Sequence, residues 1–129
     1  MTKRSITLLF LFTLATCHYS YARDDGQWTA NPDPVIHQWF QDVKQPGTGA
    51  QVSCCAETDA FEADQLAGDN PDGGFKAVIT NGRGIFPDGS VFDVPRSKIQ
   101  TQYGNPTGHI VIFLNSSGHV LCYVPLDLI

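Results

Sequence analysis

Apolar residues recur at helical spacing in one stretch near the start of the chain, residues 34–43. Residues three and four apart share one face of a helix, so this apolar face must pack against another part of the protein. Asp33 is placed to accept a hydrogen bond from the first turn, and Pro34 suits the first helical position, where no N–H is needed. The pattern predicts a helix that begins at Pro34 and ends before Pro46-Gly47. Its apolar face consists of Val35, Ile36, Trp39, Phe40 and Val43.

Later apolar runs are short and separated by turn residues, which is typical of strands. Phe75–Thr80 is a strand candidate that is closed by Asn81-Gly82. Ile85-Phe86 and Val91–Val94 flank the turn sequence Pro87–Ser90, which predicts a hairpin between them.

The strongest predicted strand pair is His109–Leu114 and His119–Val124, joined by the polar turn Asn115–Gly118. Both arms are apolar on both faces, so we expect this hairpin to be central and covered on its two sides. The whole pattern predicts an α+β domain in which one N-terminal helix packs on a small, strongly bent antiparallel sheet of about five strands. An SH3-like partial barrel is the first topology to test.

The segment Glu57–Asp72 contains six acidic residues and no Lys or Arg. Several carboxylate oxygens in one loop suit calcium, but the regular spacing of an EF-hand loop is missing. We therefore interpret the segment as a solvated acidic loop, and we predict neither a metal site nor a cofactor.

The beginning of the chain has the features of a secretory signal peptide. Lys3 and Arg4 precede the apolar run Ile6–Ala15, which is too short to cross a bilayer. Ser20–Ala22 offers small residues at the two positions that signal peptidase reads, so cleavage is expected before Arg23. We therefore expect a periplasmic or secreted protein.

Removal of a signal peptide at residues 1–22 leaves 107 of the 129 residues, enough for one domain at residues 23–129. The basic residues then fall from eight to six against thirteen acidic ones, a net charge of −7. This charge disfavours nucleic acid and anionic membranes as partners. A protein or small-molecule partner is left, and no integral membrane segment is expected. Lipidation at Cys17 is the alternative to simple cleavage.

Three cysteines remain after cleavage, namely Cys54, Cys55 and Cys122. Exported cysteines form disulfides by default. A bridge between Cys54 and Cys55 would be strained, because neighbouring Cα atoms lie only about 3.8 Å apart. In an extended segment the two side chains point to opposite faces, so one of them is expected to face the core and pair with Cys122. We assign the disulfide to Cys55 and Cys122, with Cys54 as the candidate free thiol, although the residues do not decide between the two.

The stretch His109–Leu114 with His119 after its turn resembles the histidine-bearing hairpin of NlpC/P60-type cysteine peptidases, exported enzymes that cut cell-wall peptides. The resemblance implies His109 as general base and Cys54 or Cys55 as nucleophile. In that family Ser and Gly follow the cysteine, whereas Ala56-Glu57 follow it here. The chain has no Gly-x-Ser-x-Gly elbow, phosphate loop, paired-histidine zinc motif or Cys-x-x-Cys.

Motifs over most of the mature chain resemble a group of small exported proteobacterial proteins without an assigned activity. The shared residues are Trp39-Phe40, Pro46, Thr48-Gly49, Ser53–Cys55, Val94-Pro95, Pro106–Gly108 and Cys122–Pro125. Members of that group often carry a fourth cysteine soon after the pair, where Ala60 stands here. This departure leaves one thiol over.

The expected function is that of an exported periplasmic binding or structural module without catalytic activity. Two alternatives stay open. One is an NlpC/P60-like cysteine hydrolase that uses Cys54 or Cys55 with His109, and the other is a thiol redox or soft-metal-binding protein that uses the same sulfurs.

Overall fold

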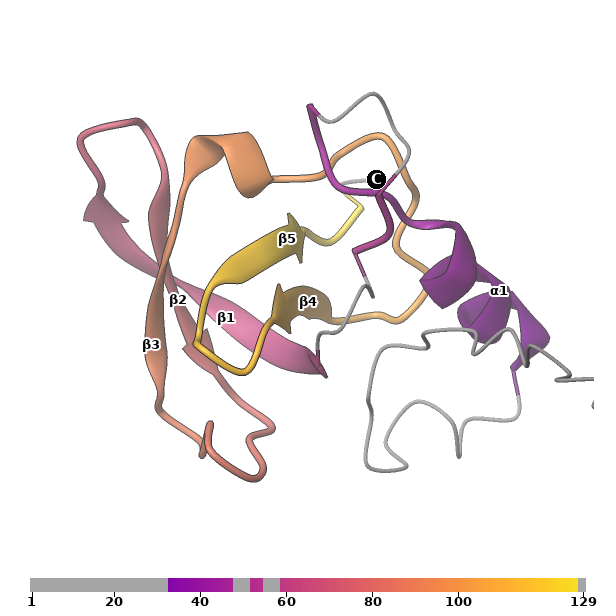
Figure 1. Ribbon diagram of the computed structural model, residues 1–129, viewed down its shortest axis with the longest axis horizontal. Helices are drawn as coiled ribbons and strands as arrows, with labels where there is room; N and C mark the ends of the chain where they lie inside the picture. Colours follow the sequence, from indigo (N-terminus) through magenta and orange to yellow (C-terminus); the bar gives the residue numbers. More distant parts are fainter. Residues whose placement is uncertain (1–32, 48–51, 55–58, 128–129) are drawn as a thin grey trace, which may run out of the picture.

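The computed structural model describes residues 33–47, 52–54 and 59–127. It contains one short helix and a five-stranded sheet in which every neighbouring pair is antiparallel, so the predicted small α+β fold is confirmed (Figure 1). The strand order across the sheet is β3-β2-β1-β4-β5. The elements are α1 (Pro34–Asp42), β1 (Asp59–Asp69), β2 (Phe75–Ile79), β3 (Val91–Val94), the 3-10 turn η1 (Arg96–Lys98), β4 (Ile110–Leu114) and β5 (Val120–Val124). Within these described residues, no helix is long and apolar enough to span a membrane.

The helix α1 begins at Pro34, as the sequence predicts, but it ends at Asp42, before the predicted stop at Pro46-Gly47, because the chain is already extended at Val43 and Lys44 pairs with Ser53 in an antiparallel bridge. Its first turn is capped by Asp33, whose Oδ1 accepts a hydrogen bond from the Val35 N–H at 2.9 Å. At the other end Val43 is already extended, and its N–H donates to the Trp39 carbonyl at 3.0 Å. Ile36, Trp39 and Val43 are buried, whereas Val35 is 61% exposed and therefore lies outside the apolar face that packs on the sheet.

The sheet has an apolar cluster on each of its faces, because successive residues of a strand point to opposite sides. Val111 and Phe113 of β4 lie in the cluster that α1 covers, while Ile112 and Leu114 lie in the cluster on the other face. All four side chains are fully buried. The last hairpin is therefore covered on both faces, as predicted. It is not central throughout, since β5 stands at one edge of the sheet.

The middle strand β1 was missed in the sequence, where we expected a solvated acidic loop. Residues 59–69 form a strand that pairs with β2 on one side and β4 on the other. Its apolar side chains alternate with acidic ones: Phe61 and Ala63 are buried, whereas Glu62 is half-buried and Asp64 is exposed. Glu62 and Asp64 thus lie on one face of a strand rather than in a loop.

The hairpin predicted between Ile85-Phe86 and Val91–Val94 was wrong, because β3 pairs with β2 instead. The ladder continues past the strand ends, where the Ile79 N–H donates to the Ser90 carbonyl at 2.9 Å. Phe86 instead folds back onto the sheet and makes edge-to-face contacts with Phe61 and Phe92, at ring separations of 5.7 and 5.2 Å.

A β-bulge in β5 sets which side chains face which cluster. Leu114 pairs with Val120 and Phe113 with Cys122, so Leu121 has no opposite residue in the ladder. The extra residue changes the alternation. Val120 and Tyr123 therefore lie in one cluster, while Cys122 lies in the cluster beneath α1.

Candidate functional site

The disulfide joins Cys54 to Cys122, with a Cα–Cα distance of 5.6 Å. The assignment of Cys55 to the bridge and of Cys54 as the free thiol was therefore wrong; Cys55 itself lies outside the described residues. The backbone explains the choice, because the Cys54 N–H donates to the Val43 carbonyl at 3.1 Å and holds Cys54 beside the end of α1. Both bonded cysteines are fully buried in the cluster between α1 and the sheet.

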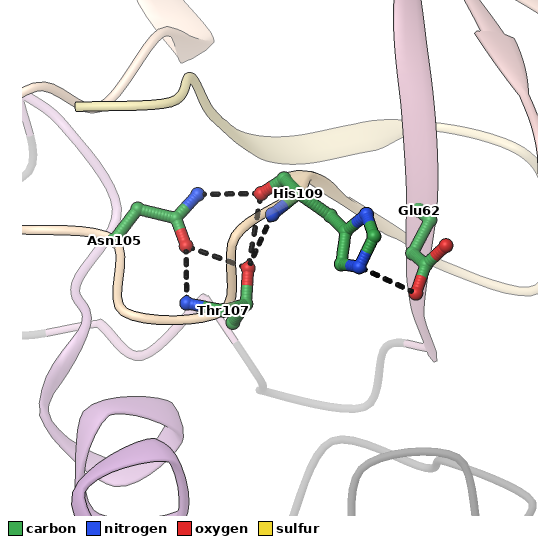
Figure 2. A network of polar contacts seen from close by, with 4 residues as sticks. All are labelled: Glu62, Asn105, Thr107 and His109. Atoms are coloured by element: carbon green, nitrogen blue, oxygen red, sulfur yellow. Dashed lines mark hydrogen bonds and ion pairs between the residues drawn. The ribbon is translucent and has the colours of Figure 1, made fainter. Parts of the chain in front are cut away.

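His109, the candidate general base, lies at the start of β4 beside Glu62 of β1 (Figure 2). Its Nε2 atom is 3.7 Å from a Glu62 carboxylate oxygen, and its side chain is 55% exposed. The Cys54 sulfur is bonded to Cys122 and cannot act as a thiolate. The form of the hydrolase hypothesis that uses Cys54 is therefore wrong, and the form that uses Cys55 falls outside the described residues.

A buried asparagine organises the loop that leads into β4 (Figure 2). The Asn105 Nδ2 group donates to the carbonyls of His109 at 2.8 Å and Pro125 at 3.1 Å, while its Oδ1 accepts from the Thr107 N–H at 3.1 Å. Its backbone N–H donates to Asp127 Oδ2 at 2.9 Å. These bonds hold the loop before β4 against the chain after β5, and the loop forms one wall of a groove beside α1.

That wall and the helix flank an open groove of about 550 Å³, which we call the α1 groove. It is lined by Pro34, Val35, Gln38, Trp39, Asp42, Tyr103, Gly104 and Pro106. Trp39 and Val35 are four residues apart and so share the helix face that looks onto the groove. The volume falls within the range of about 300–1,000 Å³ that is usual for small-molecule sites.

Trp39 is the residue of the α1 groove with an unmet hydrogen-bonding group. The side chain is 7% exposed, and its buried Nε1–H has no hydrogen-bond partner within residues 33–47, 52–54 and 59–127. Its ring contacts Phe40 edge-on at a centroid distance of 4.9 Å and lies 6.3 Å from Phe113. An unpaired buried donor of this kind destabilises a protein by about 1–3 kcal/mol, and such groups often mark functional positions.

Acidic groups flank the α1 groove. Asp42 lines it and accepts a hydrogen bond from Gln38 Nε2 at 3.0 Å. On the opposite wall, a Cβ atom added to Gly104 would lie 3.3 Å from Asp127 Oδ2, so that carboxylate is close to the groove as well. In the part of the chain that the structure describes, neither Asp42 nor Asp127 forms an ion pair with Lys, Arg or His.

A second cavity, of about 530 Å³, lies between the edge strands β3 and β5. Phe92, Pro95 and Leu121 line it together with Lys98. The nearby strand residue Tyr123 has a buried hydroxyl without a hydrogen-bond partner. Burial, and to a smaller extent the negative charge of Asp64, raise the pKa of Tyr123 to about 12. Tyr123 therefore stays protonated at neutral pH and is unsuited to act as a base.

In residues 33–47, 52–54 and 59–127, no three acidic, histidine or cysteine side chains lie close enough together to hold a metal ion. Of the six acidic residues between positions 57 and 72, Glu57 lies outside the described residues, and the other five are spread along β1 and the turn after it.

The α1 groove could not be located from the sequence. Trp39 was identified only as part of an apolar helix face, and the proline-glycine segment 106–108 only as a turn. Tyr103 carried no signal at all, because nothing local indicates that its loop packs beside a helix more than sixty residues earlier. Comparison of the chain with protein-family models, curated proteins and solved structures finds no match.

Proposed function

We propose that this chain is an exported, periplasmic binding module without catalytic activity, and that the α1 groove is its binding surface. The observation that carries the proposal is the apolar α1 groove lined by Trp39, whose buried Nε1–H has no hydrogen-bond partner among the described residues. A ligand with an apolar body and a hydrogen-bond acceptor would fill the groove and satisfy this donor. Binding sites of this composition are common: mostly apolar, with a few polar groups that fix orientation.

Two further features support the proposal. The Cys54–Cys122 disulfide is of the kind that persists in oxidising compartments, which agrees with the signal-like start of the chain. The curled sheet, whose edge strands β3 and β5 approach each other, supports an SH3-like partial barrel as the finer description of the fold (Figure 1). The relation to small exported proteobacterial proteins stays a prediction.

The alternatives now depend on one residue. A cysteine hydrolase, a thiol redox protein or a soft-metal protein would each require Cys55, because the Cys54 and Cys122 sulfurs are bonded to each other. No contact of the described residues favours these functions, so we do not advance them.

The proposal is tested by NMR on residues 23–129 carrying Trp28→Phe, which leaves Trp39 as the single source of an indole N–H signal. N,N-dimethylacetamide, which offers an acceptor and no donor, and phenol serve as probes. We expect saturable shifts of the Trp39 indole signal and of the Val35 and Gly104 backbone amides.

Matched variants locate the effect. Val35→Glu places a charge in the groove, while Ile85→Glu places one at a site that is 68% exposed and remote from the groove lining. An acidic residue in the first turn favours the helix, so lost binding in Val35→Glu would not reflect a lost helix. Probe shifts that are absent, or that persist equally in Val35→Glu, would rule out the groove as the binding surface.

A further inference from the structure

We infer that the α1 groove takes an extended peptide segment that carries proline together with one Lys or Arg. This inference rests on the proposed function of the groove and names its ligand class. Three properties of the groove lead to it: an unpaired donor, an aromatic and proline-rich lining, and flanking carboxylates.

The unpaired donor favours proline over other residues. Trp39 offers one N–H that lacks an acceptor. Most peptide residues bring a carbonyl and an N–H, and the N–H would itself need a partner once buried. Proline brings a carbonyl and no N–H. Its carbonyl can therefore accept the hydrogen bond from Trp39 without burying another N–H that lacks a partner.

The shape of the lining agrees with this choice. Trp39 and Tyr103 supply aromatic rings from opposite walls, and Pro34, Val35 and Pro106 supply the remaining apolar surface. Aromatic-lined grooves are the usual docking sites for extended proline-rich segments. Such segments hold the polyproline II conformation before binding, so little conformational entropy is lost when they dock.

The basic residue follows from charge. Asp42 lines the groove, and Asp127 lies behind Gly104 on its other wall. Neither carboxylate is paired with a basic group within residues 33–47, 52–54 and 59–127. The net charge of −7 expected for residues 23–129 adds a long-range attraction for cations.

Entry of the peptide requires a small movement of the wall. The Trp39 Nε1 atom is covered, although Trp39 lines the groove. Tyr103 is only partly buried and packs against the same cluster, so it is the side chain best placed to move aside. On this inference the bound carbonyl reaches the Trp39 N–H once the Tyr103 side chain has moved.

The test uses the same Trp28→Phe protein and the acetylated, amidated peptide Pro-Pro-Lys-Pro-Pro. Titration is followed by the Trp39 indole signal and by calorimetry. Trp39→Phe removes the donor and keeps an aromatic ring, and we expect it to weaken binding about five- to tenfold, the equivalent of one hydrogen bond. Thermal denaturation of this variant shows whether it remains folded under the conditions of the titration.

A second variant keeps the test independent of the core. Asp42→Asn should weaken binding of the lysine peptide about two- to fivefold, as expected for an exposed ion pair, and should not change binding of a norleucine analogue. Asp64→Asn removes a carboxylate on β1 that is also exposed but is not part of the groove lining, and should have no effect on either peptide.

Each contrary result has a distinct meaning. Equal binding of Ala-Ala-Lys-Ala-Ala would overturn the role of proline, and equal binding of an Asp-containing analogue would overturn the role of charge. If N,N-dimethylacetamide shifts the indole signal and no peptide does, the peptide inference fails and the binding module stands. If neither probe nor peptide acts at the groove, both fail. Groove signals that change on dilution of the protein alone would identify a second copy as the occupant and overturn the inference.

Discussion

Loss of the Cys54–Cys122 bridge is expected to lower the free energy of unfolding by about 4 kcal/mol. The two cysteines are 68 residues apart in sequence. In the chain-entropy model a closed loop of this length removes about 15 cal/mol/K from the unfolded state, which corresponds to about 4 kcal/mol at 25 °C. Small domains are stable by only about 5–15 kcal/mol, so this one bond contributes a large part of the total.

The measurement is urea denaturation of residues 23–129, followed by tryptophan fluorescence. Oxidised and reduced wild-type protein are compared first, because both keep the two sulfurs packed in the core. The Cys54→Ala/Cys122→Ala double variant then adds the packing loss of two fully buried sulfurs. Reduction should have no further effect on this variant.

The control is Cys55→Ala, which should keep the bridge and the full response to reduction. The reasoning is refuted if Cys55→Ala abolishes that response while Cys54→Ala preserves it, since Cys55 would then be the partner of Cys122. It is also refuted if reduction changes the free energy of unfolding by less than about 1 kcal/mol, because a 68-residue loop constraint would then be absent.

Three other outcomes are expected. Asn105→Ala removes the buried side chain that donates hydrogen bonds to the carbonyls of His109 and Pro125, and it should lower the free energy of unfolding in urea by about 2–3 kcal/mol. The exposed control Asn81→Ala should change that free energy by less than about 0.5 kcal/mol. Equal effects of the two variants would contradict the role of Asn105 in holding the loop. Because burial raises the pKa of Tyr123 to about 12, the folded protein holds this proton more tightly than the unfolded chain, whose tyrosine pKa is about 10. The stabilisation is therefore complete below about pH 10, and about 2 kcal/mol of it is lost as the pH rises toward 12. Tyr123→Phe should remove this pH dependence, which is measured by denaturation at several pH values. An unchanged dependence would show that another group titrates. Export should yield a mature protein that begins at Arg23, as measured by intact mass, and a product acylated at Cys17 would instead establish a lipoprotein.

The helix and the last hairpin were predictable because their local signals agree with their surroundings. Asp33 and Pro34 mark a helix start. The runs that become β4 and β5 are short, apolar and separated by a polar turn, which is typical of buried strands. The strand β1 was not predictable in the same way. Its buried positions include Ala60 and Ala63, which are weakly apolar, and the strand also carries acidic side chains that are typical of loops. The pairing of β1 with β2 and β4 overrides that local preference.

The groove and the disulfide partner depended on contacts between distant segments. Choosing between Cys54 and Cys55 requires knowing which backbone N–H donates to the Val43 carbonyl, and the sequence does not show this. Finding the groove requires knowing that the Asn105 network holds Tyr103 beside α1. Hydrogen bonds of this kind have no periodic signature in a sequence.

Because β5 contains an extra residue, the Cys54–Cys122 disulfide can form in only one of two possible alignments of β5 with β4. If the hairpin closed from its turn without a bulge, the pairing of Leu114 with Val120 would place Cys122 opposite Ile112. Cys122 would then face the cluster that contains Ile112, on the side of the sheet away from Cys54. Only the alignment with the bulge brings the two sulfurs together. Formation of the disulfide therefore favours this alignment over the one without a bulge.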